Sequence, residues 1–221
     1  MSAVEKSFSP GLTARIGCLV KDFELYAGLY DENRGYEKHH ETIELRVQIA
    51  DPVMAISDEA FLRVLSVTLR RWRAYRPGPA ASWQQLRDAF APMTSHLFRI
   101  RSYAINEADL PFDQVVSDLW AIISHVTAAI GKGSAPLVLG SKALHHVLPE
   151  LIPPMDRINT GWFLAWGPNA WVKSQAQSSF VESMKVFRAI AVDAKPRRFV
   201  TGHGWRTSVS KLIDNAIWGF R

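Results

Sequence analysis

Residues 138–160 read VLGSKALHHVLPELIPPMDRINT and carry the strongest signals in the chain. Gly140 is followed at once by a polar residue, a lysine and an apolar helical pattern, which predicts a turn into a helix. Backbone N–H groups at such a helix start can hold a phosphate. Gly140 and Ser141 are therefore candidate phosphate contacts, and Lys142 is expected to face outward beside them from the first turn.

Asp156 follows a segment that three prolines stiffen, and an apolar helical run begins shortly after it. This is the expected position of a helix N-cap, where a side-chain oxygen accepts a hydrogen bond from a backbone N–H group. A carboxylate held in this way is fixed and points into any cleft that the two segments flank. Capping alone accounts for an aspartate at this position, and catalysis is the alternative interpretation.

Helical periodicity recurs on both sides of this stretch. A helix is predicted behind Ser57-Asp58-Glu59, and Ser82 with Gln85 forms a predicted capping box. Pro111 suits the first turn of another helix, and further helices are expected at residues 12–30, 171–192 and 209–220. Residues 41–50 alternate apolar and polar side chains, which is typical of a strand. With one strand candidate among many helices, the predicted fold class is all-α.

The predicted organisation is one compact helical domain over residues 1–221. The chain is long enough for one good core. At this length a two-lobed helical array around a cleft is the natural arrangement.

The order of features in residues 138–160 resembles the helix-hairpin-helix DNA glycosylase superfamily. In that family a hairpin with a G-x-[KQ]-x-A motif is followed by an apolar helix, an extended proline-containing link and an essential aspartate. Gly140-Ser141-Lys142-Ala143 matches the second half of the hairpin motif, and residues 152–156 match the link and the aspartate. The resemblance implies the two-lobed all-α fold of that family.

The resemblance also implies an activity, in which the enzyme flips a damaged or modified base out of double-stranded DNA and cleaves its N-glycosidic bond. Asp156 would stabilise the positive charge on the sugar or orient the attacking water. Lys142 stands where bifunctional members carry a lysine that attacks C1′, and a plain phosphate-binding or structural lysine is the competing interpretation. The candidate DNA-binding residues are Gly140, Ser141, His145 and Arg157.

Two other classes of function stay open. The family hairpin usually has two glycines, whereas Val138 stands at the first of these positions, which motivates a non-catalytic nucleic-acid-binding protein with a glycosylase-like fold. The other class is a metal-dependent hydrolase that combines His39-His40 with His145-His146. Adjacent histidines on a helix point about 100° apart and cannot easily share one metal ion, so no metal site is assigned.

A group of arginines alternates with aromatic residues near the middle of the chain. Such a pattern suits a nucleic-acid surface, and a solvated helix face with its apolar side turned inward is the ordinary explanation. The group consists of Arg70, Arg71, Arg73 and Arg76 with Trp72 and Tyr75.

Composition limits the classes of protein to which the chain can belong. Hydrophobic residues make up 48% of the 221 residues and charged residues 21%, which excludes a disordered chain. Cys18 is the only cysteine, so no internal disulfide can form. The net charge of +5 is compatible with a nucleic-acid partner but is not evidence for one.

The expected environment follows from what the sequence lacks. It contains no glycine-rich dinucleotide loop and no phosphate-loop motif, so no cofactor is implied. No apolar run approaches the ~20 residues needed to span a bilayer, and the first residues lack the pattern of a signal peptide. A cytoplasmic location is expected, with double-stranded DNA as the partner, no membrane and no obligate protein partner.

Overall fold

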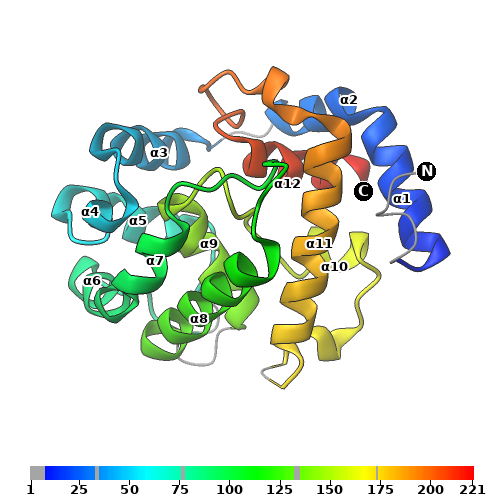
Figure 1. The fold of residues 1–221 in the computed structure, drawn as a ribbon. Coiled ribbons are helices and arrows are strands. Elements are labelled where there is room, and N and C mark those ends of the chain that lie inside the picture. Colours follow the sequence, from blue (N-terminus) through cyan, green and yellow to red (C-terminus); the bar gives the residue numbers. More distant parts are fainter. Residues whose placement is uncertain (1–7, 33–34, 76–77, 132–134, 173) are drawn as a thin grey trace.

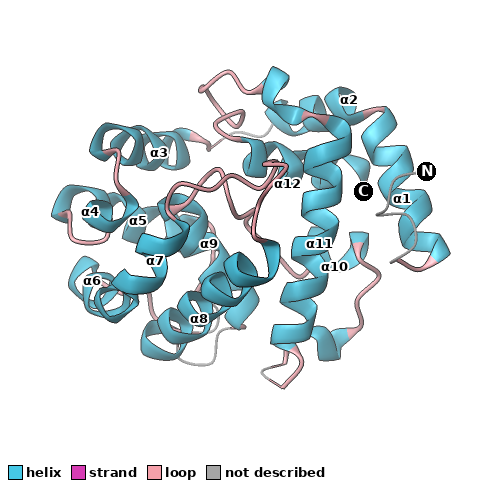
Figure 2. Cartoon of the chain, in the orientation of Figure 1, coloured by secondary structure: helices cyan, strands magenta, loops and turns pink. Residues whose placement is uncertain are grey.

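Helices are the only regular structure in the described part of the chain, which comprises residues 8–32, 35–75, 78–131, 135–172 and 174–221 of a computed structural model (Figures 1 and 2). The predicted all-α class is confirmed. The α-helices are α1 (Pro10–Lys21), α2 (Phe23–Leu29), α3 (Glu37–Ile49), α4 (Pro52–Ala55), α5 (Glu59–Arg71), α6 (Trp83–Phe90), α7 (Thr94–Ile100), α8 (Phe112–Ile130), α9 (Pro136–Val147), α10 (Asn159–Phe163), α11 (Ala176–Ala194) and α12 (Val209–Phe220). Short 3₁₀ turns are η2 (Tyr30–Glu32), η3 (Ala91–Met93), η4 (Pro168–Trp171) and η5 (Pro196–Phe199).

Several helices begin where capping residues predict. The Asp58 carboxylate accepts a hydrogen bond of 2.7 Å from the backbone N–H of Phe61 and starts α5. Ser82 and Gln85 form the predicted capping box at the start of α6. Such a cap stabilises a helix by about 1 kcal/mol relative to alanine, so these helix starts are determined locally.

Residues 41–49 lie in α3 and not in a strand, and Ala50 is the residue that ends the helix. The buried side chains of α3 are His39, Thr42, Ile43 and Arg46, which follow the i, i+3, i+4, i+7 spacing of one helix face. Val47 is 68% exposed, so the apolar alternation does not match the pattern of burial. The prediction of a strand is wrong because the segment packs as a helix on α5.

Helix α9 begins at Pro136, so the predicted turn at Gly140 is wrong. Gly140 lies inside the helix, where a Cβ atom would lie 2.6 Å from Cγ2 of Ile123 in α8. The glycine therefore permits a close approach of α8 and α9. Inside a helix each N–H binds the carbonyl four residues earlier, so the N–H groups of Gly140 and Ser141 are used within α9 and form no phosphate-binding turn.

The helices pack in two groups (Figure 1). Helices α3 to α9 contact one another, and the N-terminal helices α1 and α2 pack with α10, α11 and α12 from the other end of the chain. Gly219 of α12 lies directly against the backbone of Tyr26 in α2. One hydrophobic cluster runs through both groups. Among the described helices, none combines the length and apolar character that crossing a bilayer would require.

Candidate active site

A cavity of about 420 Å³ opens between the two groups of helices. Its volume falls in the range of small-molecule sites in proteins. The lining residues come from η2, α5, α9, α12 and the loops before α3, α10 and α12, and most of them are charged or aromatic. They are Tyr30, Gly35, Arg71, Trp72, Lys142, Pro154, Asp156, Trp205, Lys211 and Asp214.

Asp156 reaches this cavity from the extended link between α9 and α10. Its Oδ1 accepts hydrogen bonds from the backbone N–H groups of Ile158 (2.8 Å) and Asn159 (2.6 Å), and its Oδ2 accepts one from Nδ2 of Asn159 (2.9 Å). The carboxylate therefore caps the turn that leads into α10, as its position in the sequence predicts. These three bonds fix its orientation at the edge of the cavity.

Side chains of α9 hold the link that carries Asp156. The Ser141 hydroxyl accepts a hydrogen bond of 2.9 Å from the backbone N–H of Met155, and Nδ1 of His145 donates one of 2.8 Å to the carbonyl of Ile152. Ser141 and His145 are fully buried. The structure thus places Ser141 and His145 behind the site as supports, together with the buried Gly140, and not on a surface that a DNA strand could reach.

Lys142 is the one predicted site residue of α9 whose side chain does reach the cavity. It is half-buried, and its Nζ donates a hydrogen bond of 3.0 Å to the carbonyl of Trp72. Burial lowers the pKa of the Lys142 ammonium below its ordinary value, and the charge of Lys211 adds to this effect, while Asp156 and Asp214 oppose it. The structure therefore brings Lys142 and Asp156 into one cavity.

Lys211 and Asp214 form an ion pair in the part of the wall that α12 provides. They are three residues apart in α12, and Nζ of Lys211 lies 2.6 Å from Oδ2 of Asp214 and 2.6 Å from Oδ1 of Asn215. Burial alone would lower the pKa of Lys211, but Asp214, followed by Tyr30 and Asp156, raises it above its ordinary value. The pair therefore favours the protonated, positively charged form of Lys211, while burial raises the pKa of the Asp214 carboxyl and Lys211 opposes that rise.

The sequence predictions miss this ion pair. Its signal is present, because α12 is apolar on most of its surface and its first two turns nevertheless contain a lysine and an aspartate one turn apart. Residues that are buried and charged need a partner. What the sequence does not reveal is that the pair faces Asp156, which lies more than fifty residues earlier in the chain.

Three buried histidines lie behind the cavity. Trp72 and Trp205, which line the cavity, stack on the ring of His39 with centroid distances of 5.2 and 5.3 Å. The His39 ring also lies 5.7 Å from that of His145 and 5.2 Å from that of His146. The two tryptophans therefore contact the cavity on one side and the histidine cluster, defined as His39, His145 and His146, on the other.

Hydrogen bonds determine the protonation of this cluster. A carbonyl can only accept, so the 2.8 Å bond to the Lys142 carbonyl requires a proton on Nδ1 of His146. Neutral His146 then accepts at Nε2 from Nδ1 of His39, at 3.1 Å. The remaining nitrogen of His39 accepts from the hydroxyl of Thr207 at 3.0 Å. Both nitrogens of His39 and both nitrogens of His146 are therefore hydrogen-bonded with the two rings neutral.

Burial is the main reason that these rings stay neutral. It lowers the pKa values of His39 and His145 well below 6.5 and that of His146 to about 4, and for His39 and His145 the neighbouring His146 adds to the effect. Nε2 of His145 is buried and accepts no hydrogen bond within the described residues. His39 of one pair meets His145 and His146 of the other and is hydrogen-bonded to His146, whereas His40 lies apart and contacts residues 202–203. No group of three or more metal-ligating side chains within the described ranges could hold a metal ion.

The predicted basic residues occupy the surroundings of the cavity. Arg71 lines the cavity, Arg70 and Arg73 are exposed near it, and Arg76 lies outside the described residues. Arg157 is exposed and lines a second hollow of about 1020 Å³ beside α8. Arg157 and the Arg71 side of the cavity are thus two surface positions from which cations could contact a polyanion.

Comparison with known proteins adds no relative. No protein-family model, no curated protein and no solved structure matches this chain. The cavity and its residues are therefore the basis for assigning a function.

Proposed function

We propose that this protein is a DNA glycosylase-like enzyme, which releases a damaged or modified base by cleaving the N-glycosidic bond. The observation that carries the proposal is that Asp156 and Lys142, from two separate elements, line one cavity with the aromatic rings of Trp72 and Trp205. Aromatic rings offer stacking surfaces to a base. We further propose that the two helix groups correspond to the two lobes of the superfamily, since the cavity lies between them.

Asp156 would act on the sugar. As the base leaves, C1′ gains positive charge, and a nearby carboxylate stabilises that charge or orients the attacking water. The hydrogen bonds from Ile158 and Asn159 hold the carboxylate in advance. A preorganised charge does not have to be reoriented during the reaction, which is the main source of such electrostatic catalysis.

Lys142 has two possible roles at the same site. Its lowered pKa increases the fraction of free amine at neutral pH, which favours attack on C1′ and formation of a Schiff base. In the other role it contacts the backbone of the substrate as a cation. Reduction by borohydride distinguishes the two, because only the Schiff base is trapped as a stable adduct.

Binding to the duplex would rely on exposed cations near the two hollows. Arg71 and Arg157 occupy such positions. The residues expected to form a phosphate-binding turn, Gly140 and Ser141, lie inside α9 and are not used for this contact. Each phosphate that such a cation neutralises releases counterions, so binding is expected to weaken steeply with salt.

Base release from defined duplexes tests the proposal. Duplexes that carry damaged, mismatched or modified bases are incubated with the protein and treated with alkali to reveal abasic sites. The wild type is expected to release the base from at least one duplex. The single-turnover rate of base release is expected to fall about 100-fold or more in Asp156→Asn. Asp193→Asn, an exposed aspartate of α11, is the matched control and is expected to leave the rate unchanged.

The outcomes separate the alternatives. Full activity of Asp156→Asn contradicts the proposed mechanism. Duplex binding with a steep salt dependence, but without release of any base, supports the non-catalytic nucleic-acid-binding protein instead.

A further inference from the structure

Lys211 places a fixed positive charge in the wall of the cavity, and the scheme above does not use it. Its side chain is 1% exposed, and its ammonium donates to Asp214 and to Asn215. The amide of Asn215 is itself held, because its Nδ2 donates a hydrogen bond of 3.0 Å to the carbonyl of Trp205. The ammonium therefore stays in position before any substrate arrives.

The same ammonium lies close to the aromatic rings of the cavity. Nζ of Lys211 is 4.2 Å from the ring centroid of Tyr30 and 4.8 Å from that of Trp205. A cation is attracted to the face of an aromatic ring, so a positively charged substrate base would compete with Lys211 for these rings. It would also meet the charge of Lys211 itself at short range, which is unfavourable.

The two carboxylates of the cavity do not remove this conflict. Asp214 is engaged by Lys211 at 2.6 Å. Asp156 is assigned to the sugar in the scheme above. Arg71 adds a further positive group to the lining. The lining thus holds three basic side chains, Arg71, Lys142 and Lys211, against two carboxylates, and this excess favours negative charge in the cavity.

We propose that the cavity accepts nucleotides whose base is neutral and leaves as an anion, and that Lys211 stabilises the departing base. This inference rests on the proposed function and names its substrate class. Alkylated purines that already carry a positive charge are excluded from that class. They leave as neutral molecules and would gain nothing from a neighbouring ammonium.

The step balances without a further reactant. The bond between C1′ and the base nitrogen breaks, and both electrons leave with the base, beside Lys211. The positive charge at C1′ forms beside Asp156. Water then adds to C1′, and the proton that it loses is finally taken up by the released base.

Two sets of duplexes test this inference. One set carries neutral bases (uracil, 5-fluorouracil, hypoxanthine or 8-oxoguanine), and the other carries the cationic bases 7-methylguanine or 3-methyladenine. Single-turnover release is measured for the wild type and for Lys211→Met/Asp214→Asn. This double variant removes both charges together, because loss of one alone would leave the other buried without a partner. Thermal melting of the variant establishes that it is folded.

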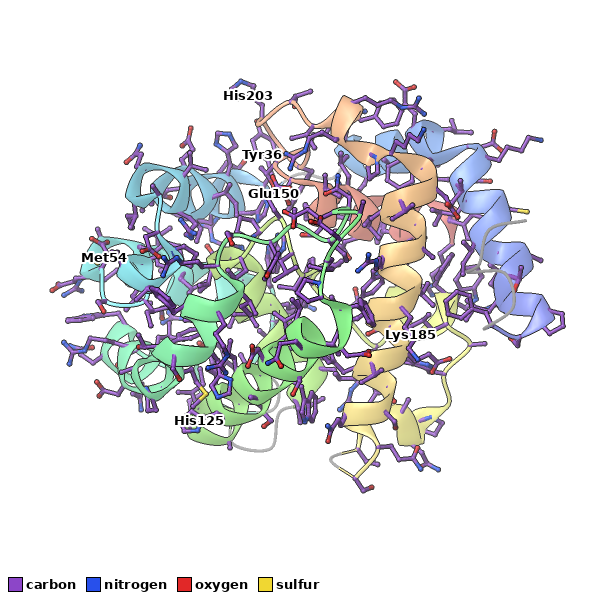
Figure 3. All side chains as sticks on the ribbon, viewed as in Figure 1. Tyr36, Met54, His125, Glu150, Lys185 and His203 are labelled. Carbon is purple, nitrogen blue, oxygen red and sulfur yellow. The ribbon has the colours of Figure 1, made fainter. Side chains whose placement is uncertain are left out.

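Lys185→Met is the matched control. Lys185 is an exposed lysine of α11 (Figure 3). It is not among the residues that line the cavity. The wild type is expected to release neutral bases and to leave the cationic ones in place. The double variant is expected to lose about 100-fold on neutral bases, and less on 5-fluorouracil than on uracil, because fluorine makes the base a better leaving group. A merely structural role of Lys211 would not produce this dependence on the leaving group.

Each contrary result has a separate meaning. Release of cationic bases in preference to neutral ones overturns the inference and leaves the proposed function standing. An unchanged rate of the folded double variant on neutral bases also overturns the inference and leaves the proposed function standing. Release of no base from either set overturns the proposed function and the inference together.

Discussion

Two neighbouring regions of this protein bury titratable side chains in opposite ways. The cavity holds charged groups away from bulk water, and the ion pair between Lys211 and Asp214 balances their charges. The histidine cluster, on the other side of Trp72 and Trp205, holds three titratable rings that are all neutral. The paired charges line the cavity, whereas the three neutral imidazoles are fully buried behind its wall. Charged side chains therefore lie on the cavity side of the two tryptophans, and neutral titratable rings lie on the other side.

Lowering the pH is expected to have the largest effect on the free energy of unfolding, because it tests whether the histidine cluster is neutral. The pKa values of the cluster are lowered in the folded protein, so the folded state binds fewer protons than the unfolded state. Their stabilising contribution is therefore fully present above pH 6.5 and is lost as the pH falls towards the folded-state pKa, which is about 4 for His146. Between the folded-state and unfolded-state pKa values each histidine contributes a slope of at most about 1.4 kcal/mol per pH unit, so three together give at most about 4 kcal/mol per unit.

Urea unfolding at a series of pH values between 7 and about 4 measures this slope. His146→Gln removes one of the three groups and is expected to reduce the slope by about a third. His203→Gln is the control, because His203 is exposed at the outer edge of the molecule (Figure 3). A free energy of unfolding that stays constant across this pH range would contradict the neutral cluster.

Removal of one charge from the cavity is expected to have the next largest effect. Lys211→Met leaves Asp214 in the interior without its partner and is expected to cost about 3–5 kcal/mol of unfolding free energy. Lys211→Met/Asp214→Asn removes both charges and is expected to cost clearly less. Urea unfolding of the two variants at pH 7 makes the comparison, with Lys185→Met expected to stay within about 0.5 kcal/mol of the wild type. Equal losses in the single and double variants would show that the ion pair is not what stabilises this wall.

The smallest effect on stability is expected from loss of the hydrogen bond between Thr207 and His39 of the histidine cluster. Thr207→Val removes the hydroxyl that donates to Nε2 of His39 and leaves that buried nitrogen without a partner. The expected cost is about 1–2 kcal/mol at pH 7. Thr201→Val, at an exposed position in the same loop, serves as control. An unchanged stability of Thr207→Val would mean that His39 does not depend on this bond for its tautomer.

Local sequence signals predict much of the fold. The caps at Asp58 and Ser82 and the apolar periodicity of α5, α8 and α12 indicate helices that the structure contains. The errors at α3 and α9 have one cause. In both segments the residue pattern is ambiguous by itself, and packing against α5 or α8 selects the helix. Propensity is a weak guide wherever tertiary contacts override it.

The candidate site also contains some residues that local sequence signals indicate and others that only tertiary packing places there. Asp156 and Lys142 are indicated by a short motif, and the structure places both at one cavity. Gly140, Ser141 and His145 belong to the same motif but lie in the interior, because the helix starts one turn earlier than their order predicts. No local pattern connects Asp156 with Lys211 and Asp214, since the position of α12 at the cavity depends on its long-range packing against α2.

The sequence by itself determined the all-α class, several helix starts and the aspartate and lysine at the centre of the candidate site, because these depend on neighbouring residues. Only the tertiary structure decided which charges face each other and which histidines stay neutral. Burial and long-range pairing set both of these properties. They depend on which distant segments exclude water together, and residues far apart in the chain acquire that relation only on folding.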